Sequence, residues 1–122
     1  MTKILIVDDS GLARRATRQI LERAGYEVVD APDGMAALEK YFLDKPQLVL
    51  LDVTMRDMDG LEVLRRIKAL DAEARVVIVT ADVQRSTREM AETEGAAGFL
   101  VKPVSAQPLL DIVSQGLERA MP

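Results

Sequence analysis

Five short apolar runs recur along the chain at even intervals, and they constrain its fold more than any other feature. They are rich in Val, Ile and Leu and occupy residues 3–7, 27–31, 47–51, 75–79 and 98–101. Continuous apolar runs of this length are typical of strands buried on both faces of a parallel sheet. We therefore predict five buried strands.

The segments between these runs have the spacing of amphipathic helices. The expected helices cover residues 12–24, 33–43, 59–70, 84–94 and 106–119, and Gly25 ends the first of them. The predicted buried positions are Leu12, Ala16, Ile20 and Ala24 in the first helix, Leu61, Leu64, Ile67 and Leu70 in the third, and Leu109, Leu110, Val113 and Leu117 in the fifth. Five strands alternating with five helices predict an α/β fold with a parallel sheet and right-handed crossovers.

The composition narrows the chemistry that the chain can perform. Its 122 residues match the size of one compact domain, so we expect a single domain over residues 1–122. The chain has no cysteine and no histidine, which excludes thiolate or imidazole metal sites and any Ser-His or Cys-His nucleophile. A bound metal must then be held by oxygen, which favours Mg²⁺, Ca²⁺ or Mn²⁺.

The charge balance argues against nucleic acid as a partner. Sixteen basic and twenty acidic side chains leave a net charge of −4, whereas nucleic-acid binding needs clustered Lys and Arg. Arg14, Arg15 and Arg18 are the nearest approach to such a cluster, and we expect them on the solvated face of the first helix. No apolar stretch is long enough to span a membrane and no signal peptide is visible, so we expect a cytoplasmic protein.

Polar residues stand at the carboxyl ends of four of the expected strands. The first strand is followed by Asp8-Asp9, the third by Asp52, the fourth by Thr80 and the fifth by Lys102-Pro103. In α/β sheets of this kind, ligands bind at this edge. Two carboxylates about 4 Å apart repel by roughly 4 kcal/mol at an effective dielectric constant of 20, and an oxygen-liganded divalent cation relieves that repulsion.

This set of residues suits phosphoryl transfer, which needs positioning and positive charge more than covalent chemistry. Asp52 is the candidate nucleophile, because it stands alone on a central strand while Asp8 and Asp9 form a metal-holding pair. Thr80 can donate its hydroxyl to a phosphoryl oxygen, and Lys102 supplies a fixed positive charge. A cis bond before Pro103 would aim Lys102 inward. Lys45-Pro46 precedes a strand, so we assign it to an ordinary turn at the opposite edge.

The chain resembles the receiver domain of bacterial two-component response regulators, especially single-domain regulators of the chemotaxis kind. The resemblance covers nearly the whole sequence. The motifs that carry it are Ile4-Leu5-Ile6-Val7-Asp8-Asp9-Ser10, Leu50-Leu51-Asp52, Met58-Asp59-Gly60, Val79-Thr80-Ala81 and Phe99-Leu100-Val101-Lys102-Pro103. It implies a flavodoxin-like, doubly wound three-layer fold with strand order 2-1-3-4-5.

The resemblance also implies a role for each matching residue. Asp52 corresponds to the phosphorylated aspartate, and Asp8, Asp9, Asp52 and the backbone carbonyl of Thr54 to the ligands of Mg²⁺, for which Mn²⁺ can substitute. Thr80 and Phe99 correspond to the switch pair, and Lys102 to the lysine that pairs with the phosphoryl group. The implied output surface is the fourth helix, fifth strand and fifth helix. Phe99 can equally be read as an ordinary core aromatic.

The resemblance further implies partners. A sensor histidine kinase or a histidine phosphotransfer protein would donate the phosphoryl group, and a target protein or phosphatase would read the switch. We expect a monomer, with a phosphorylation-linked dimer as the alternative. We expect a stand-alone regulator without an effector domain, which signals by protein contact, although a receiver cut from a longer chain would look the same.

One loop departs from the family pattern. Arg56 stands where the family usually has proline, so we expect a change in loop flexibility or dephosphorylation rate rather than in the acceptor residue. Thr54 and Asp82 occupy positions that tune the access of water to the phosphoryl group.

Three other readings of the same residues are less favourable. A flavodoxin-like electron carrier would need a phosphate-binding loop where Asp8-Asp9 stands, and an aspartate-nucleophile phosphatase would carry an Asp-x-Asp arrangement and a substrate-covering insertion. A degenerate receiver, acting as an unphosphorylated interaction module, would have lost site residues that are all present here.

Overall fold

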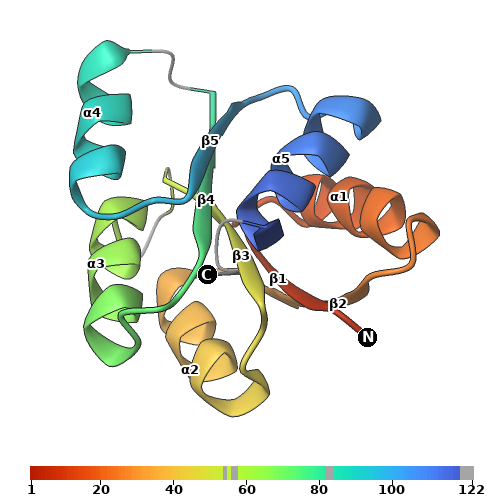
Figure 1. Ribbon diagram of the computed structural model, residues 1–122, viewed down its shortest axis with the longest axis horizontal. Coiled ribbons are helices and arrows are strands. Elements are labelled where there is room, and N and C mark those ends of the chain that lie inside the picture. The colour runs from red at the N-terminus through yellow and green to blue at the C-terminus, as the bar shows by residue number, and fades with distance from the viewer. Residues whose placement is uncertain (54, 56–57, 82–83, 119–122) are drawn as a thin grey trace.

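The computed structural model describes residues 1–53, 55, 58–81 and 84–118. A five-stranded sheet forms its centre, in the order β2-β1-β3-β4-β5, and every neighbouring pair of strands is parallel (Figure 1). The strands are β1 (Lys3–Val7), β2 (Glu27–Ala31), β3 (Leu48–Asp52), β4 (Val76–Thr80) and β5 (Gly98–Val101). The predicted fold class and strand order are confirmed. However, β3 and β4 each begin and end one residue later than expected, so Asp52 and Thr80 are the last residues of their strands.

Helices alternate with these strands and cover both faces of the sheet. They are α1 (Gly11–Arg23), α2 (Gly34–Asp44), α3 (Gly60–Leu70), α4 (Arg85–Thr93) and α5 (Ala106–Glu118). In Figure 1, α1 and α5 lie on one side of the sheet and α2, α3 and α4 on the other. Side chains of Ser10, Asp33 and Asp59 cap the first three helices by accepting from backbone N–H groups, which satisfies donors that a helix start leaves free. No described helix combines the length and apolar character needed to cross a membrane.

Alternate residues of each strand enter two separate cores. Leu5 and Val7 of β1 pack on the side of α2, α3 and α4, whereas Ile4 and Ile6 pack on the side of α1 and α5. This division follows from the two-residue period of a strand. Burial on both faces explains why the strand sequences are continuously apolar.

The predicted buried face of the first helix is wrong at three of its four positions, whereas Ile20 is partly buried against the core as expected. Leu12 is 77% exposed and Ala16 and Ala24 are also exposed, while Leu21 is fully buried. Alanine is compatible with either side of a helix, so a stripe traced through alanines does not determine the rotation of the helix about its axis. In the third helix Leu70 is also misassigned: it is 61% exposed, because the last residue of α3 extends past the buried stripe of Leu61, Leu64 and Ile67.

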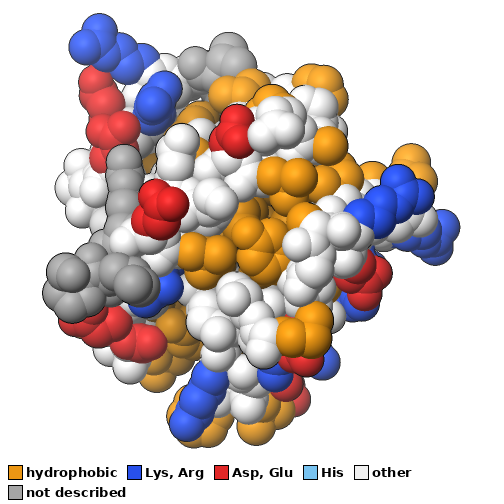
Figure 2. All heavy atoms as spheres, turned by 45° about the vertical axis from the view of Figure 1, so that its right-hand side comes forward, with side chains coloured by type: hydrophobic (Ala, Val, Ile, Leu, Met, Phe, Trp, Pro, Cys, Tyr) orange, Lys and Arg blue, Asp and Glu red, His pale blue; other side chains and the backbone are white. Residues whose placement is uncertain are grey.

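Small side chains on α1 leave a hollow between α1, α5 and the sheet. Its volume is about 420 Å³, and its walls include Ala13 and Thr17 of α1, Leu50 of β3 and Leu109 of α5. Figure 2 shows hydrophobic side chains gathered on this side of the molecule. Asp8 and Lys102 also line this hollow, so it reaches the edge where the polar strand ends meet.

Candidate functional site

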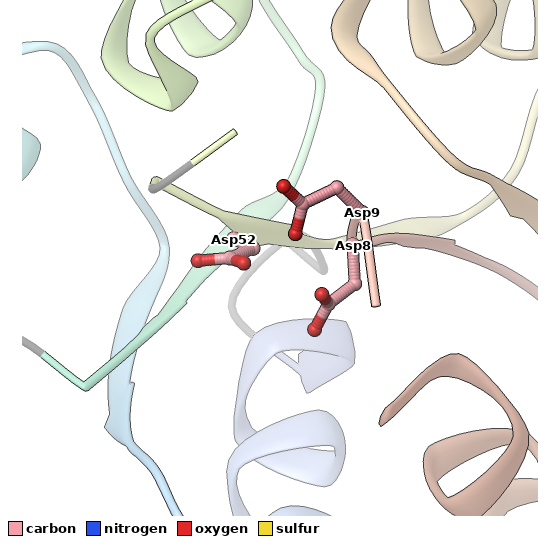
Figure 3. A group of neighbouring side chains, drawn as sticks. All are labelled: Asp8, Asp9 and Asp52. Carbon is pink, nitrogen blue, oxygen red and sulfur yellow. The ribbon is translucent and has the colours of Figure 1, made fainter. Parts of the chain in front are cut away.

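Three aspartates meet at the carboxyl edge of the sheet. Asp8 and Asp9 directly follow β1, and Asp52 ends β3, the neighbouring strand. One carboxylate oxygen from each residue lies within 4.8 Å of those from the other two, and Figure 3 shows the three groups gathered at the ends of these strands. Asp8 and Asp52 are only 6% and 5% exposed, while Asp9 is open to solvent. Adjacent strands therefore bring together residues that are 44 positions apart.

Short-range hydrogen bonds hold the Asp8 side chain in place. Its Oδ1 accepts from the backbone N–H of Ser10 over 2.9 Å, and Ser10 Oγ in turn accepts from the N–H of Ala13. Ser10 thus begins α1 and orients Asp8 at the same time. The Asp8 backbone N–H continues the sheet by donating to the carbonyl of Ala31 over 3.2 Å.

Lys102 places a positive charge among these carboxylates. Its Nζ lies 2.7 Å from Asp8 Oδ2 and 3.5 Å from Asp52 Oδ2. The Lys102 N–H donates to the Thr80 carbonyl over 2.7 Å, and the bond between Lys102 and Pro103 is cis. Burial alone would lower the pKa of Lys102, but its hydrogen bond to Asp8 and the charges of Asp52 and Asp8 outweigh burial and raise that pKa.

One ammonium group cannot balance three carboxylates at such short range. The donor set consists of oxygen atoms only, and two of the three carboxylates are buried away from bulk water. These are the ligands that Mg²⁺ prefers, and Mg²⁺ typically takes only a few carboxylates and keeps several waters. The residues present therefore fit a hard divalent cation.

Thr80 and Phe99 lie on the two strands beside this cluster. Thr80 ends β4 and is fully buried. In the ladder between β4 and β5, Phe99 is paired with Ile78 and Thr80 with Val101, so the side chains of Phe99 and Thr80 project from the same face of the sheet. The Phe99 ring is half-buried against the core beneath α2, α3 and α4, and the Arg88 guanidinium lies 5.6 Å from its centroid.

Comparison with known proteins places this chain in a family. A family model, the response regulator receiver domain, matches residues 4–114. The chain belongs to the response regulator receiver domain family. The chemotaxis protein CheY of Bacillus subtilis is 41% identical to it, over 94% of this chain and 97% of that protein.

Two solved structures illustrate the likeness of this receiver domain to its relatives. A CheY-like receiver domain of Methanospirillum hungatei superposes with a TM-score of 0.93 at 31% identity, covering 98% of this chain and 96% of that one. CheY of Borrelia burgdorferi, in a complex with CheX, BeF₃⁻ and Mg²⁺, superposes with a TM-score of 0.88 at 34% identity, covering 92% and 86%.

Some expectations for this receiver domain fall on residues that the structure does not describe. Thr54, Arg56 and Asp82 lie outside the described residues. The expected carbonyl ligand and the expected effects of the loop residues therefore stay predictions.

Two residues near the site of this receiver domain have roles that sequence reasoning missed. Gly60 lies so close to β3 that an added Cβ would be 2.3 Å from Val53 Cα and 2.5 Å from the Asp52 carbonyl oxygen. A side chain at this position would therefore displace the end of β3. Arg14 was expected to face water, but it is half-buried and donates to the backbone carbonyl of Asp8 over 2.6 Å. Its position in the first turns of the helix, close to Asp8-Asp9, was the available signal.

Proposed function

We propose that this receiver domain accepts a phosphoryl group on Asp52 in a Mg²⁺-dependent reaction and acts as a signalling switch. The observation that carries the proposal is the pairing of a buried carboxylate at the end of a central strand with Lys102 Nζ 3.5 Å away, inside a cluster of three aspartates. An isolated aspartate at a strand end, without the lysine and the other carboxylates, would not support this proposal.

The transfer requires one bond to form and one to break. An oxygen of the Asp52 carboxylate attacks the phosphorus atom of the donor, the P–O bond of an aspartyl phosphate forms, and the donor's bond to phosphorus breaks. With a phosphohistidine donor, the imidazole leaves with the electron pair of that bond and takes up a proton. Because this chain has no histidine, the donor is another protein, a sensor histidine kinase or a histidine phosphotransfer protein, or a small acyl phosphate.

The charges of the site support this step. Asp8, Asp9 and Asp52, with the Thr54 carbonyl, would hold Mg²⁺ or Mn²⁺, which supplies positive charge to the phosphoryl oxygens. Lys102 would exchange its hydrogen bond to Asp8 for one to a phosphoryl oxygen. The Thr80 hydroxyl would donate to another. Slow hydrolysis of the aspartyl phosphate would return the domain to its resting state.

Intact-mass measurement with acetyl phosphate and Mg²⁺ tests the acceptor. We expect the wild-type protein to gain one phosphoryl group that hydroxylamine removes, and we expect no adduct without Mg²⁺ or in Asp52→Asn. Asp111→Asn serves as a matched control, because Asp111 is an exposed aspartate of α5 that accepts a hydrogen bond from Gln107 of the same helix. A wild-type protein that stays unmodified, or an Asp52→Asn variant that is still modified, refutes the proposal.

We propose further that phosphorylation shifts Thr80, Phe99 and the α4–β5–α5 surface between two states, which a target protein or phosphatase reads. The packing of Arg88 on Phe99 ties α4 to β5 and supports this coupling. Amide shifts with BeF₃⁻ and Mg²⁺ test it: we expect changes at Thr80, Phe99 and along α4. If only residues around Asp52 respond, the switch is wrong even where phosphorylation occurs.

A further inference from the structure

The Arg14 side chain folds back over the loop between β1 and α1. Its Nη1 donates to the Asp8 carbonyl oxygen over 2.6 Å, and a Cβ added to Gly11 would lie 3.7 Å from Nη2. The guanidinium group therefore lies over Gly11 rather than extending into solvent. Two other arginines of this helix differ, since Arg15 is exposed and Arg18 pairs with Asp30 and Glu22.

The carbonyl that Arg14 binds belongs to the peptide bond between Asp8 and Asp9. A peptide group is planar, so fixing the direction of its oxygen also fixes the direction in which the chain continues to the next Cα. The exposed Asp9 carboxylate therefore depends on this hydrogen bond for its position. Asp8 depends on it less, because its carboxylate is already held by Ser10 and Lys102.

The backbone of α1 anchors the same contact. The Arg14 N–H donates to the Ser10 carbonyl over 3.0 Å as part of the first helical turn. Ser10 in turn holds Asp8 Oδ1. Arg14 thus connects the helix start, the Asp8–Asp9 peptide and the aspartate cluster in one closed set of hydrogen bonds.

We propose that Arg14 is a positioning residue for the metal site: it fixes the Asp8–Asp9 peptide so that both carboxylates face Asp52. This inference rests on the proposed Mg²⁺-dependent function. Residues that orient metal ligands without touching the metal typically change metal affinity about 10- to 100-fold when they are lost, and we expect an effect of that size.

Charge alone predicts the opposite sign. Arg14 is a cation beside a site that binds a cation, so removing its charge without moving any ligand would strengthen Mg²⁺ binding. If Arg14 instead positions the Asp8–Asp9 peptide, its removal would weaken Mg²⁺ binding. The direction of the change therefore separates the two roles.

The experiment measures Mg²⁺ affinity by following the amide signals of Asp9 and Ser10 during a titration of the metal-free protein. We expect Arg14→Met to bind Mg²⁺ roughly 10-fold or more weakly, and Arg14→Lys, which keeps the charge but not the planar donor group, to lie between it and wild type. Arg15→Met is the control, because it removes an exposed charge from the same helix and should change affinity less than about twofold.

Urea unfolding without Mg²⁺ separates positioning from a general loss of structure. If Arg14→Met is less stable but binds Mg²⁺ as tightly as wild type, or more tightly, the inference is overturned. If Arg14→Met does not fold, Arg14→Lys decides: wild-type affinity in that variant refutes the inference. A wild-type protein that binds no Mg²⁺ instead overturns the proposed function itself, and this inference with it.

Discussion

Lys102 lies closer to Asp8 than to Asp52: its Nζ is 2.7 Å from the Asp8 carboxylate and 3.5 Å from that of Asp52, and it forms an ion pair with both. The ammonium group is therefore nearer to Asp8, the proposed metal ligand, than to Asp52, the proposed acceptor. In the proposed mechanism, Lys102 exchanges its hydrogen bond to Asp8 for one to a phosphoryl oxygen on Asp52. Binding of a cation by Asp8 favours that change, because it provides Asp8 with another positive charge.

Replacing Lys102 tests its contributions to metal-free stability, to Mg²⁺ binding and to phosphorylation. In Lys102→Met two buried carboxylates lose their counter-charge, so we expect the metal-free protein to be less stable by about 2 kcal/mol. We expect Mg²⁺ to bind more tightly, because no ammonium competes for Asp8, while phosphorylation by acetyl phosphate slows. Urea unfolding with and without Mg²⁺ measures the first two effects. Unchanged stability and unchanged Mg²⁺ affinity would show that the pairing with Asp8 contributes neither to the unfolding free energy nor to Mg²⁺ binding.

The same ammonium group makes stability depend on alkaline pH. The pKa of Lys102 is raised above its ordinary value of 10.5 in the folded protein. Its contribution is therefore complete below that value and is lost as the pH rises toward the folded-state pKa. Above pH 10.5 we expect the unfolding free energy to fall more steeply for wild type than for Lys102→Met. Parallel curves for the two proteins contradict this assignment.

Asp9 is the aspartate whose removal should cost function without costing stability. It is exposed and carries a negative charge beside Asp8 and Asp52. In Asp9→Asn we expect metal-free stability to rise by up to about 1 kcal/mol, because repulsion is relieved, and Mg²⁺ affinity to fall roughly 10-fold or more. Thermal unfolding with and without Mg²⁺ measures both. Asp111→Asn should alter neither, and a loss of metal-free stability in Asp9→Asn would argue against repulsion in the cluster.

Gly60 should tolerate no side chain. Its Cβ would lie 2.3 Å from Val53 Cα and 2.5 Å from the Asp52 carbonyl oxygen, so Gly60→Ala must displace the end of β3. We expect a loss of about 3 kcal/mol in unfolding free energy, together with weaker Mg²⁺ binding. Gly11→Ala, where the new Cβ would lie at an ordinary contact distance of 3.7 Å from Arg14 Nη2, should be neutral or stabilising by about 0.5 kcal/mol. Equal effects of the two substitutions would mean that close approach to β3 is not the cause.

Tyr41 joins α2 to the end of α3 on the side remote from the site. Its hydroxyl donates to Asp71 Oδ2 over 2.8 Å, and burial, the hydrogen bond to Asp71 and the Asp71 charge raise the pKa of Tyr41. We expect Tyr41→Phe to lose about 1 kcal/mol of stability at neutral pH and to keep wild-type phosphorylation. Because folding raises the pKa of Tyr41, we expect its phenol to ionise in wild type only when alkaline pH unfolds the chain. Tyrosinate absorbance should then show a late rise that accompanies unfolding, and this rise should be missing in Tyr41→Phe. Wild-type stability in Tyr41→Phe would show that the hydrogen bond makes no net contribution.

The positions of the secondary-structure elements could be predicted because each one leaves a local signal. Runs such as residues 3–7 are apolar throughout because both faces of the sheet are covered, and Ser10, Asp33 and Asp59 stand where helices begin. The rotation of α1 could not be predicted, because its alanines satisfy either face. The arrangement of the strands in the sheet came from resemblance rather than from any local pattern.

The sequence by itself determined which residues stand at the carboxyl edge of the sheet, because a buried apolar run stops at a polar residue that is either the last residue of the strand or directly follows it. Asp8, Asp9, Asp52, Thr80 and Lys102 were identified in that way. Only the tertiary structure decided that Lys102 pairs with Asp8, that Arg14 turns back onto the Asp8 carbonyl, and that Gly60 touches β3. Such contacts depend on distances of a few ångströms between segments whose relative positions are set by the packing of the core. Local periodicity specifies the direction of a side chain along its own element, but it carries no information about the partner that packing brings within reach.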